Sequence, residues 1–161
     1  MTIQDRARNR RVVYFAHPLG GDIEANLARA ERWLLWLMDY EPQVSFLCPW
    51  MAYVRAFRAR YGAIDDKGHP FRERAMLDNL AIAQLGGVEG IALCGPRITP
   101  GMHTELNTIA ADGSWVANLT ALGTGFEPPS KHEVESLYGD VFAGTDPFSP
   151  LALGRARWEH R

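Results

Sequence analysis

The residue whose type and position best suit chemistry is Glu105, which lies where an apolar stretch gives way to a helix. Residues 88–94, VEGIALC, form a short apolar run typical of a buried strand, and Pro100 and Gly101 allow a tight turn before helical spacing begins. Such a loop lies at the carboxyl edge of an open α/β sheet, where these folds bind ligands. We therefore expect Glu105, in the first turn of that helix, to lie at the mouth of a cleft. The alternative is a carboxylate that only complements the helix dipole.

A second glycine-containing loop, HPLGGD at residues 17–22, follows a predicted strand at 11–16, and its Asp22 is placed to cap a helix from Ile23. The carboxyl ends of parallel strands share one edge, so this loop should face the cleft of Glu105. The residues expected there are Tyr14, His17, Gly20, Gly21, Gly101 and Glu105. The double glycine resembles a phosphate cradle in outline, but it lacks the GxGxxG pattern and a Walker lysine, and Asp22 would repel a phosphate. A plain tight turn fits equally well.

The rest of the chain alternates strand and helix patterns, which predicts an α/β three-layer sandwich with a mostly parallel sheet of four or five strands. Beyond residue 126 there are few periodic segments, so we expect a domain over 1–126 and a C-terminal extension over 127–161 that packs on the domain or is partly extended. Strands are predicted at 11–16, 44–48, 88–94 and 115–122, and helices from 23, from 49, over 71–85, from 102 and over 133–138, followed by an extended tail.

Composition narrows the class of protein. The chain has 161 residues, of which 47% are hydrophobic and 22% charged, with a net charge of -2, so neither a nucleic acid polymer nor a membrane surface is an expected partner. Cys48 and Cys94 each lie in an apolar run without a ligand partner, which favours buried thiols over a zinc site or a disulfide. Without a signal peptide or a membrane-spanning stretch, the sequence predicts a cytoplasmic protein.

Four segments together carry a resemblance to a known family: YFAHPLGGDIEANLARAERWLLWL, CPW, RAMLDN and PGMHTEL. In this order the chain resembles the nucleoside 2-deoxyribosyltransferase-like superfamily, including its small bacterial and phage members of uncharacterised function. The resemblance covers Val12 to Gly125. It implies a flavodoxin-like, Rossmann-like fold that cleaves the N-glycosidic bond of a nucleoside or nucleotide. The sugar then passes to a second base or to water, and no cofactor or metal is implied.

The resemblance also implies roles for individual residues. Glu105 matches the nucleophile that forms a glycosyl-enzyme intermediate, and Tyr14 matches the tyrosine that orients it. Asp78 matches a helix aspartate that contacts the sugar or handles a proton. Asn118 matches an asparagine that enters a neighbouring subunit's site, which implies a homo-oligomer, a dimer or larger, with sites near the interface. The hypothesis requires Tyr14, Asp78 and Glu105 to converge on one pocket.

Two departures from the family pattern concern substrate recognition. Thr99 stands where transferases have a second carboxylate that handles the base. The HPLGGD loop lacks the arginine and serine residues that hold a 5′-phosphate in nucleotide-hydrolysing relatives, and His17 could instead contact a phosphate, line a base pocket or pack beside the turn. Trp50, after the second strand, could stack on a base or belong to the core. Possible anion contacts, or solvated surface residues, are Arg72, Arg74 and Arg97.

Other classes of function remain compatible with the same residues. PGMHTE resembles one half of the PGGxGTxxE pattern of the lysine-decarboxylase-like phosphoribohydrolase group, whose relatives include nucleotide-sensing modules. A sensor would bind a nucleotide in the same cleft without turnover. A phage or mobile-element interaction protein on a degenerate enzyme fold is a third interpretation, with Thr99 marking lost catalysis. The sequence does not choose between hydrolase and transferase, or between a nucleoside and a 5′-phosphorylated substrate.

Overall fold

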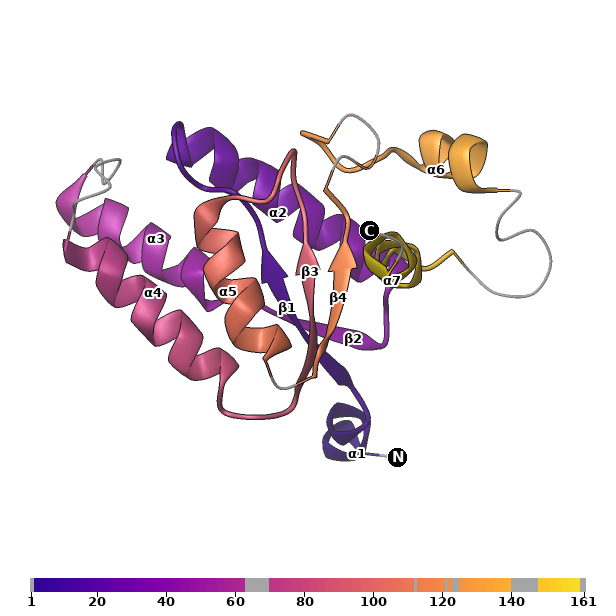
Figure 1. Cartoon of the computed structure of the whole chain (residues 1–161), viewed down its shortest axis with the longest axis horizontal. Helices are drawn as coiled ribbons and strands as arrows, with labels where there is room; N and C mark the ends of the chain where they lie inside the picture. The colour runs from indigo at the N-terminus through magenta and orange to yellow at the C-terminus, as the bar shows by residue number, and fades with distance from the viewer. Residues whose placement is uncertain are drawn as a thin grey trace.

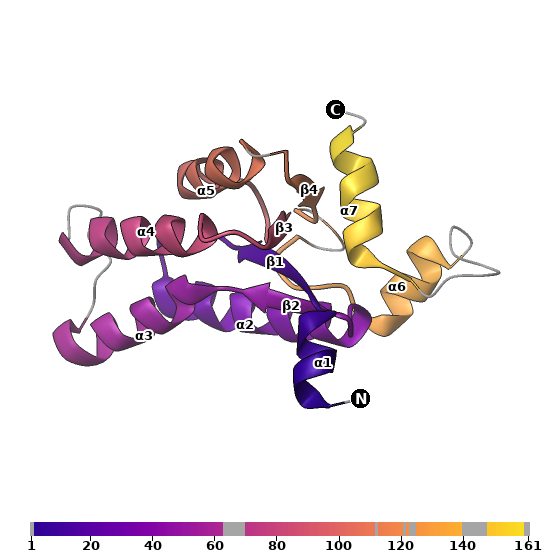
Figure 2. The same cartoon turned by 90° about the horizontal axis from the view of Figure 1, so that it is seen from below.

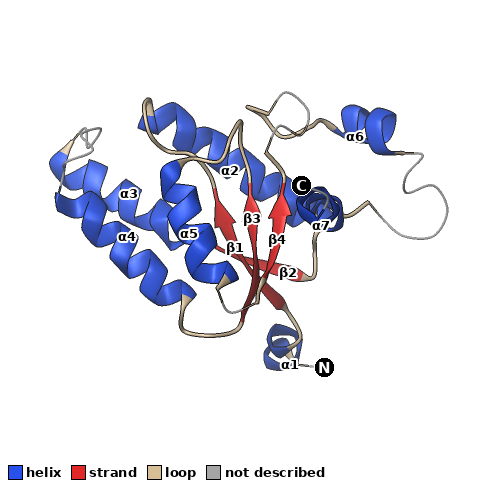
Figure 3. Cartoon of the chain, viewed as in Figure 1, coloured by secondary structure: helices blue, strands red, loops and turns tan. Residues whose placement is uncertain are grey.

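The structure is a computed structural model that describes residues 2–62, 70–111, 113–120, 122, 125–139 and 148–159. Its four strands are β1 (Arg11–Ala16), β2 (Val44–Leu47), β3 (Val88–Leu93) and β4 (Trp115–Asn118). All strand pairs are parallel, and the order across the sheet is β2-β1-β3-β4 (Figures 1 and 3). The predicted mostly parallel α/β fold of Rossmann-like or flavodoxin-like type is confirmed.

Helices cover both faces of the sheet. They are α1 (Ile3–Arg8), α2 (Ile23–Tyr40), α3 (Pro49–Tyr61), α4 (Pro70–Ala83), α5 (Pro100–Ala110), α6 (Lys131–Tyr138) and α7 (Pro150–Glu159). Figure 2 shows α4 and α5 on one side of the sheet and α2 on the other. The short exposed helix α1 was not expected from the sequence. Within the described residues, no helix combines the length and the apolar character needed to cross a bilayer.

The core forms where the central strands meet these helices. The last four residues of β1 and the last four of β3 are all buried, as expected for strands covered on both faces. From α2, the apolar side chains of Leu27, Trp33 and Leu37 pack into the same core. Local capping then sets the start of α2, because an Asp22 side-chain oxygen accepts a hydrogen bond from the Ala25 backbone amide at 3.0 Å. The predicted cap at Asp22 is confirmed.

The strand order places a topological switch point between β1 and β3. The chain leaves β1 towards β2 on one side and leaves β3 towards β4 on the other, so the loops that follow β1 and β3 diverge above their shared edge. The register sets Ala16 beside Leu93, and the Cys94 amide donates a hydrogen bond to the Ala16 carbonyl at 3.0 Å. The two glycine-containing loops therefore start side by side.

Strand β4 is shorter than the predicted strand over 115–122. It ends at Asn118, whose side-chain oxygen accepts hydrogen bonds from the Thr120 backbone amide at 3.1 Å and the Thr120 hydroxyl at 2.6 Å. A side chain that bonds its own backbone two residues on favours a turn over a continuing strand. The prediction of a strand to residue 122 was wrong for this reason.

The predicted extended tail is also wrong, because residues 150–159 form α7 and pack against β4. Glu41, just after α2, accepts hydrogen bonds from the Ser149 hydroxyl at 2.6 Å and the Leu151 amide at 2.9 Å, which satisfies the start of α7. At the other end, Arg157 donates to the Thr120 carbonyl at 3.0 Å. The contacts of α7 come from residues distant in sequence, which explains why its short apolar pattern was not recognised.

The packing of α7 depends on a glycine. A Cβ atom at Gly154 would lie 2.7 Å from a Leu119 methyl carbon and 3.1 Å from the Ala117 backbone carbonyl carbon. We expect Gly154→Leu to lower the free energy of unfolding by about 2 kcal/mol, because an added side chain must push α7 away from β4. Urea unfolding measures this, with Ala156→Leu on the exposed side of α7 as the matched control. Equal stability of the two variants would contradict the packing.

Candidate active site

A cavity of about 580 Å³ opens at the switch point, between the loop after β1 and the start of α5. Its volume lies in the range of small-molecule sites, about 300–1,000 Å³. Helix α4 contributes the remaining wall. The lining residues are His17, Pro18, Leu19, Gly20, Gly21, Arg72, Met76, Arg97, Thr99, Pro100, Gly101, Met102 and Glu105. The expected loops therefore do border one cavity.

Glu105 is the only carboxylate among the described residues of this wall. It is the sixth residue of α5 and lies in the second turn, so the expectation of a first-turn position is corrected. The helix dipole acts mainly within the first turn, and a dipole role for Glu105 loses its support. The side chain is nevertheless buried, with 7% of the residue exposed. Such a carboxylate needs either a partner or a proton.

Tyr14 supplies the partner. Its hydroxyl, fully buried at the middle of β1, donates a hydrogen bond to Glu105 Oε1 at 2.7 Å. Burial raises the pKa of Glu105 to about 7, and the hydrogen bond from Tyr14 lowers it in part. Burial and the nearby carboxylate raise the pKa of Tyr14, so the phenol stays a neutral donor. Among the described residues Glu105 Oε2 has no hydrogen-bond partner, which leaves one carboxylate oxygen for a ligand.

His17 lines the same cavity but is held by its own loop. Its Nδ1 lies 2.8 Å from the Pro18 carbonyl oxygen, which can only accept, so Nδ1 carries the proton and Nε2 is the acceptor. Nε2 is buried without a partner among the described residues. Burial lowers the pKa of His17 to about 4, so the imidazole is neutral at pH 7. Before a ligand binds, His17 therefore adds no positive charge to the cavity.

Hydrogen bonds and a positive φ angle fix the backbone at the glycines of the first loop. Asn26 donates from its side-chain amide to the Gly20 carbonyl at 2.9 Å and the Leu19 carbonyl at 3.3 Å, which ties the loop to α2. Gly21 has φ +91°, a conformation that favours glycine. On the facing wall, Gly101 comes within ordinary van der Waals distance of Met76, 3.7 Å from where its Cβ would lie.

Asp78 does not lie on the cavity wall. Its carboxylate forms an ion pair with Arg74, 2.8 Å from Nε to Oδ2. Met76 of the same helix does line the cavity, and two residues further along an α-helix a side chain points about 200° away. The requirement that all three side chains converge on one pocket is therefore not met. Glu105 lines the cavity, Tyr14 lies behind it and reaches the site only through its hydrogen bond to Glu105, and Asp78 faces elsewhere.

Trp50 and Asn118 also lie elsewhere than expected. The Trp50 indole donates to the Phe15 carbonyl at 2.9 Å and stacks on the Phe15 ring, 5.9 Å between centroids, so it belongs to the core. The Asn118 side chain is buried and bonds Thr120 within its own chain. Neither residue is available to a ligand in the cavity.

Thr99, the departure from the family pattern, has a structural task. Its hydroxyl accepts a hydrogen bond from the Met102 amide at 3.4 Å and caps α5, with Pro100 in the first position of the helix. Threonine followed by proline is a recognisable helix start, and this signal was present in the sequence. Sequence reasoning missed two methionines of the wall, Met76 and Met102. For Met76, the only signal was its spacing of four from Arg72 on one helix face.

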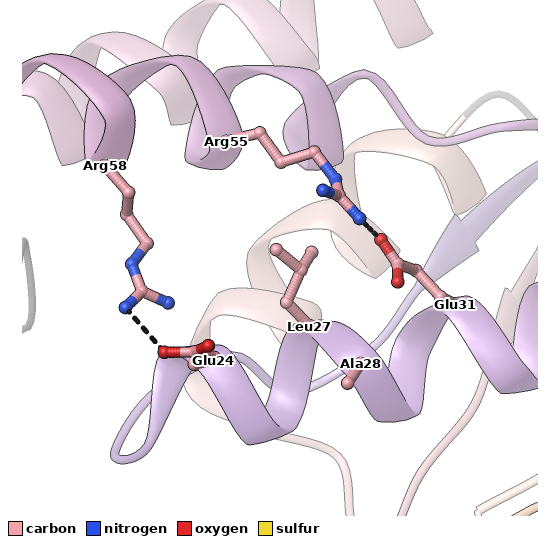
Figure 4. Close-up of a pocket in the computed structure, with 6 residues that line it drawn as sticks. All are labelled: Glu24, Leu27, Ala28, Glu31, Arg55 and Arg58. Carbon is pink, nitrogen blue, oxygen red and sulfur yellow. Dashed lines mark hydrogen bonds and ion pairs between the residues drawn. The ribbon is translucent and has the colours of Figure 1, made fainter.

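A second hollow, of about 380 Å³, lies between α2 and α3 (Figure 4). Its four charged side chains satisfy one another: Arg58 pairs with Glu24 at 3.3 Å, and Arg55 pairs with Glu31. No charge is left over for a ligand, in contrast to the cavity of Glu105. Within the described ranges, no three His, Cys, Asp or Glu residues are grouped so as to hold a metal ion.

Comparison with known proteins found no match for this chain among protein-family models, curated proteins or solved structures. The resemblance to the nucleoside 2-deoxyribosyltransferase-like superfamily therefore rests on the sequence motifs alone. What the site can do must be inferred from its own residues.

Proposed function

We propose that this protein cleaves or exchanges the N-glycosidic bond of a nucleoside or nucleotide, with Glu105 as the nucleophile. This is a reduced form of the hypothesis that needs only Glu105 and Tyr14, because Asp78 does not face the cavity. The observation that carries the proposal is the state of the Glu105 carboxylate. It is buried on the wall of a cavity at the switch point, one oxygen is held by the Tyr14 hydroxyl at 2.7 Å, and the other oxygen is free. A single oriented carboxylate is what attack on an anomeric carbon requires.

The reaction would proceed in two displacements. Glu105 Oε2 attacks C1′ of the sugar, the C1′–N bond breaks, and its electron pair leaves on the base. The nearby negative charge stabilises the oxocarbenium-like transition state. Water or a second base then attacks C1′ of the glycosyl ester and releases the carboxylate, and the proton lost by the attacking group passes to the departed base anion or to solvent. Tyr14 donates to Oε1 throughout, which keeps Oε2 aligned.

The proton balance of the first step involves no second carboxylate. Asp78, expected to handle a proton, is paired with Arg74 instead. The leaving base therefore departs as its anion or takes a proton from water that enters the cavity. Because the pKa of Glu105 is about 7, the reactive ionised form increases as the pH rises through neutrality. This rise with pH is the profile expected for the first displacement.

The test is a panel assay. Purified protein is incubated with ribonucleosides, deoxyribonucleosides and their 5′-monophosphates, each with and without a second free base, and released base is measured by liquid chromatography. Release without a second base indicates a hydrolase, and release only with it indicates a transferase. If no member of the panel loses its base, the proposal is rejected.

A nucleotide-binding module without turnover is the second candidate, and the position of Asp78 outside the cavity favours it, since the wall then lacks an acid for the leaving base. Such a protein would show ligand-dependent thermal shifts with members of the same panel and no release of base.

The homo-oligomer implied by Asn118 stays a prediction, which light scattering coupled to gel filtration would check.

A further inference from the structure

Two arginines on the cavity wall have no partner within the described part of the chain. Arg72 lies in the first turn of α4, and Arg97 lies in the loop between β3 and α5. No ion pair, hydrogen bond or aromatic ring engages either guanidinium group among the described residues. Both side chains are exposed and reach the cavity from different elements.

This state is unusual within the molecule. Outside α1, every other arginine that the structure describes is engaged by an ion pair, a hydrogen bond or a stacked ring. These residues are Arg10, Arg11, Arg29, Arg32, Arg55, Arg58, Arg60, Arg74, Arg155 and Arg157. The two guanidinium groups left unengaged are thus the two that line the cavity.

The acids near the cavity do not cancel this charge. Asp22, which might repel a phosphate, bonds the Ala25 amide at the start of α2 and is not a wall residue. Asp78 is neutralised by Arg74. Glu105 is the one carboxylate of the described wall, and it is buried with one oxygen hydrogen-bonded to Tyr14. The exposed rim of the cavity is therefore cationic.

We propose that Arg72 and Arg97 bind the phosphate of a nucleoside 5′-monophosphate, which makes the substrate a nucleotide rather than a free nucleoside. Guanidinium groups present planar pairs of donors that match phosphate oxygens. The Gly20-Gly21 segment adds a wall with no side chain, so a bulky anionic group has room beside it. With C1′ at Glu105, the 5′-phosphate lies at the other end of the sugar, towards the rim. This inference rests on the proposed function for its assignment of the sugar.

Calorimetric titration with AMP, GMP, CMP and dTMP and with the corresponding nucleosides tests the proposal without requiring turnover. We expect monophosphates to bind more tightly than nucleosides. Arg72→Gln and Arg97→Gln should each weaken monophosphate binding about tenfold, the scale of one charge-assisted hydrogen bond at an exposed site, and weaken nucleoside binding much less. Higher salt should weaken monophosphate binding selectively. Arg74→Gln is the matched control, since Arg74 lies on the same helix but is paired off the wall.

Three results would overturn the phosphate site: wild-type binding that ignores the phosphate, an Arg72→Gln/Arg97→Gln double variant that binds monophosphates as the wild type does, or no binding of any monophosphate. Thermal unfolding of each variant confirms that it is folded. The two proposals fail separately. Arginine-dependent binding without base release would reject the glycosidic reaction but support the phosphate site. Base release with equal KM for nucleosides and monophosphates would support the reaction but reject the phosphate site.

Discussion

Glu105→Gln is expected to reduce base release by about a thousandfold or more, the scale of loss when a covalent nucleophile is removed. The amide keeps the size of the side chain and can still accept a hydrogen bond from Tyr14, but it cannot form a stable glycosyl ester. The measurement is kcat/KM for the best substrate of the panel. Mass spectrometry of acid-quenched wild-type enzyme should also detect a sugar adduct on the peptide that contains Glu105.

Glu89→Gln is the matched control for this variant. Glu89 is a carboxylate of the same chain, exposed at the amino-terminal end of β3 and paired with Arg11 at 2.7 Å. Its replacement should leave base release unchanged. Undiminished release by Glu105→Gln would reject Glu105 as the nucleophile, whatever the substrate.

The same substitution is expected to stabilise the protein at pH 8, by about 3 kcal/mol, if a carboxyl pKa of 4.5 in the unfolded chain rises to about 7 on folding. The folded state then binds the proton more tightly than the unfolded state. The free energy of unfolding therefore falls as the pH rises from 4.5 to 7 and stays low above it. Glutamine carries no charge at any of these pH values, so its advantage should vanish near pH 4.

Urea unfolding of the wild type and of Glu105→Gln between pH 4 and pH 9 measures this difference. For His17→Gln the pH dependence should be reversed, with the stability advantage of the variant growing as the pH falls. The reason is that burial lowers the pKa of His17 from 6.5 to about 4. As the pH falls from 6.5 towards 4, the unfolded wild type takes up a proton on His17 that the folded state does not, so its free energy of unfolding falls. The free energy of unfolding of the His17 variant should fall less. A Glu105→Gln advantage that does not change with pH would mean that the carboxyl group titrates normally.

Much of the fold could be predicted because its determinants are local or repeat along the chain. Central parallel strands are buried on both faces, so β1 and β3 are apolar runs that stand out in the sequence. Caps such as Asp22 are read from a few adjacent residues. The meeting of Tyr14 and Glu105 was predicted through the resemblance. Parallel strand order makes it physically reasonable, since Tyr14 lies in β1 and Glu105 lies in α5, the helix that follows the neighbouring strand β3.

Other features depended on tertiary packing. Asp78 was expected beside Glu105, yet the packing of α4 brings Met76 and Arg72 to the cavity instead. Asp78 stays off the wall and pairs with Arg74, one turn earlier in the same helix. Trp50 became a core residue because the Phe15 backbone and ring lie next to it in the folded chain.

By itself, then, the sequence determined the parallel α/β fold, the central strands with the helices that follow them, and the position of Glu105 beside a cleft, since these follow from periodicity, capping and strand order. Only the tertiary structure decided which charged groups face the cavity and which pair across the fold. Ion pairs such as Arg32 with Glu127 join residues far apart in the chain, and no local pattern encodes them. That Arg72 and Arg97 lack a partner becomes visible only in the folded chain, where every other described arginine outside α1 is engaged.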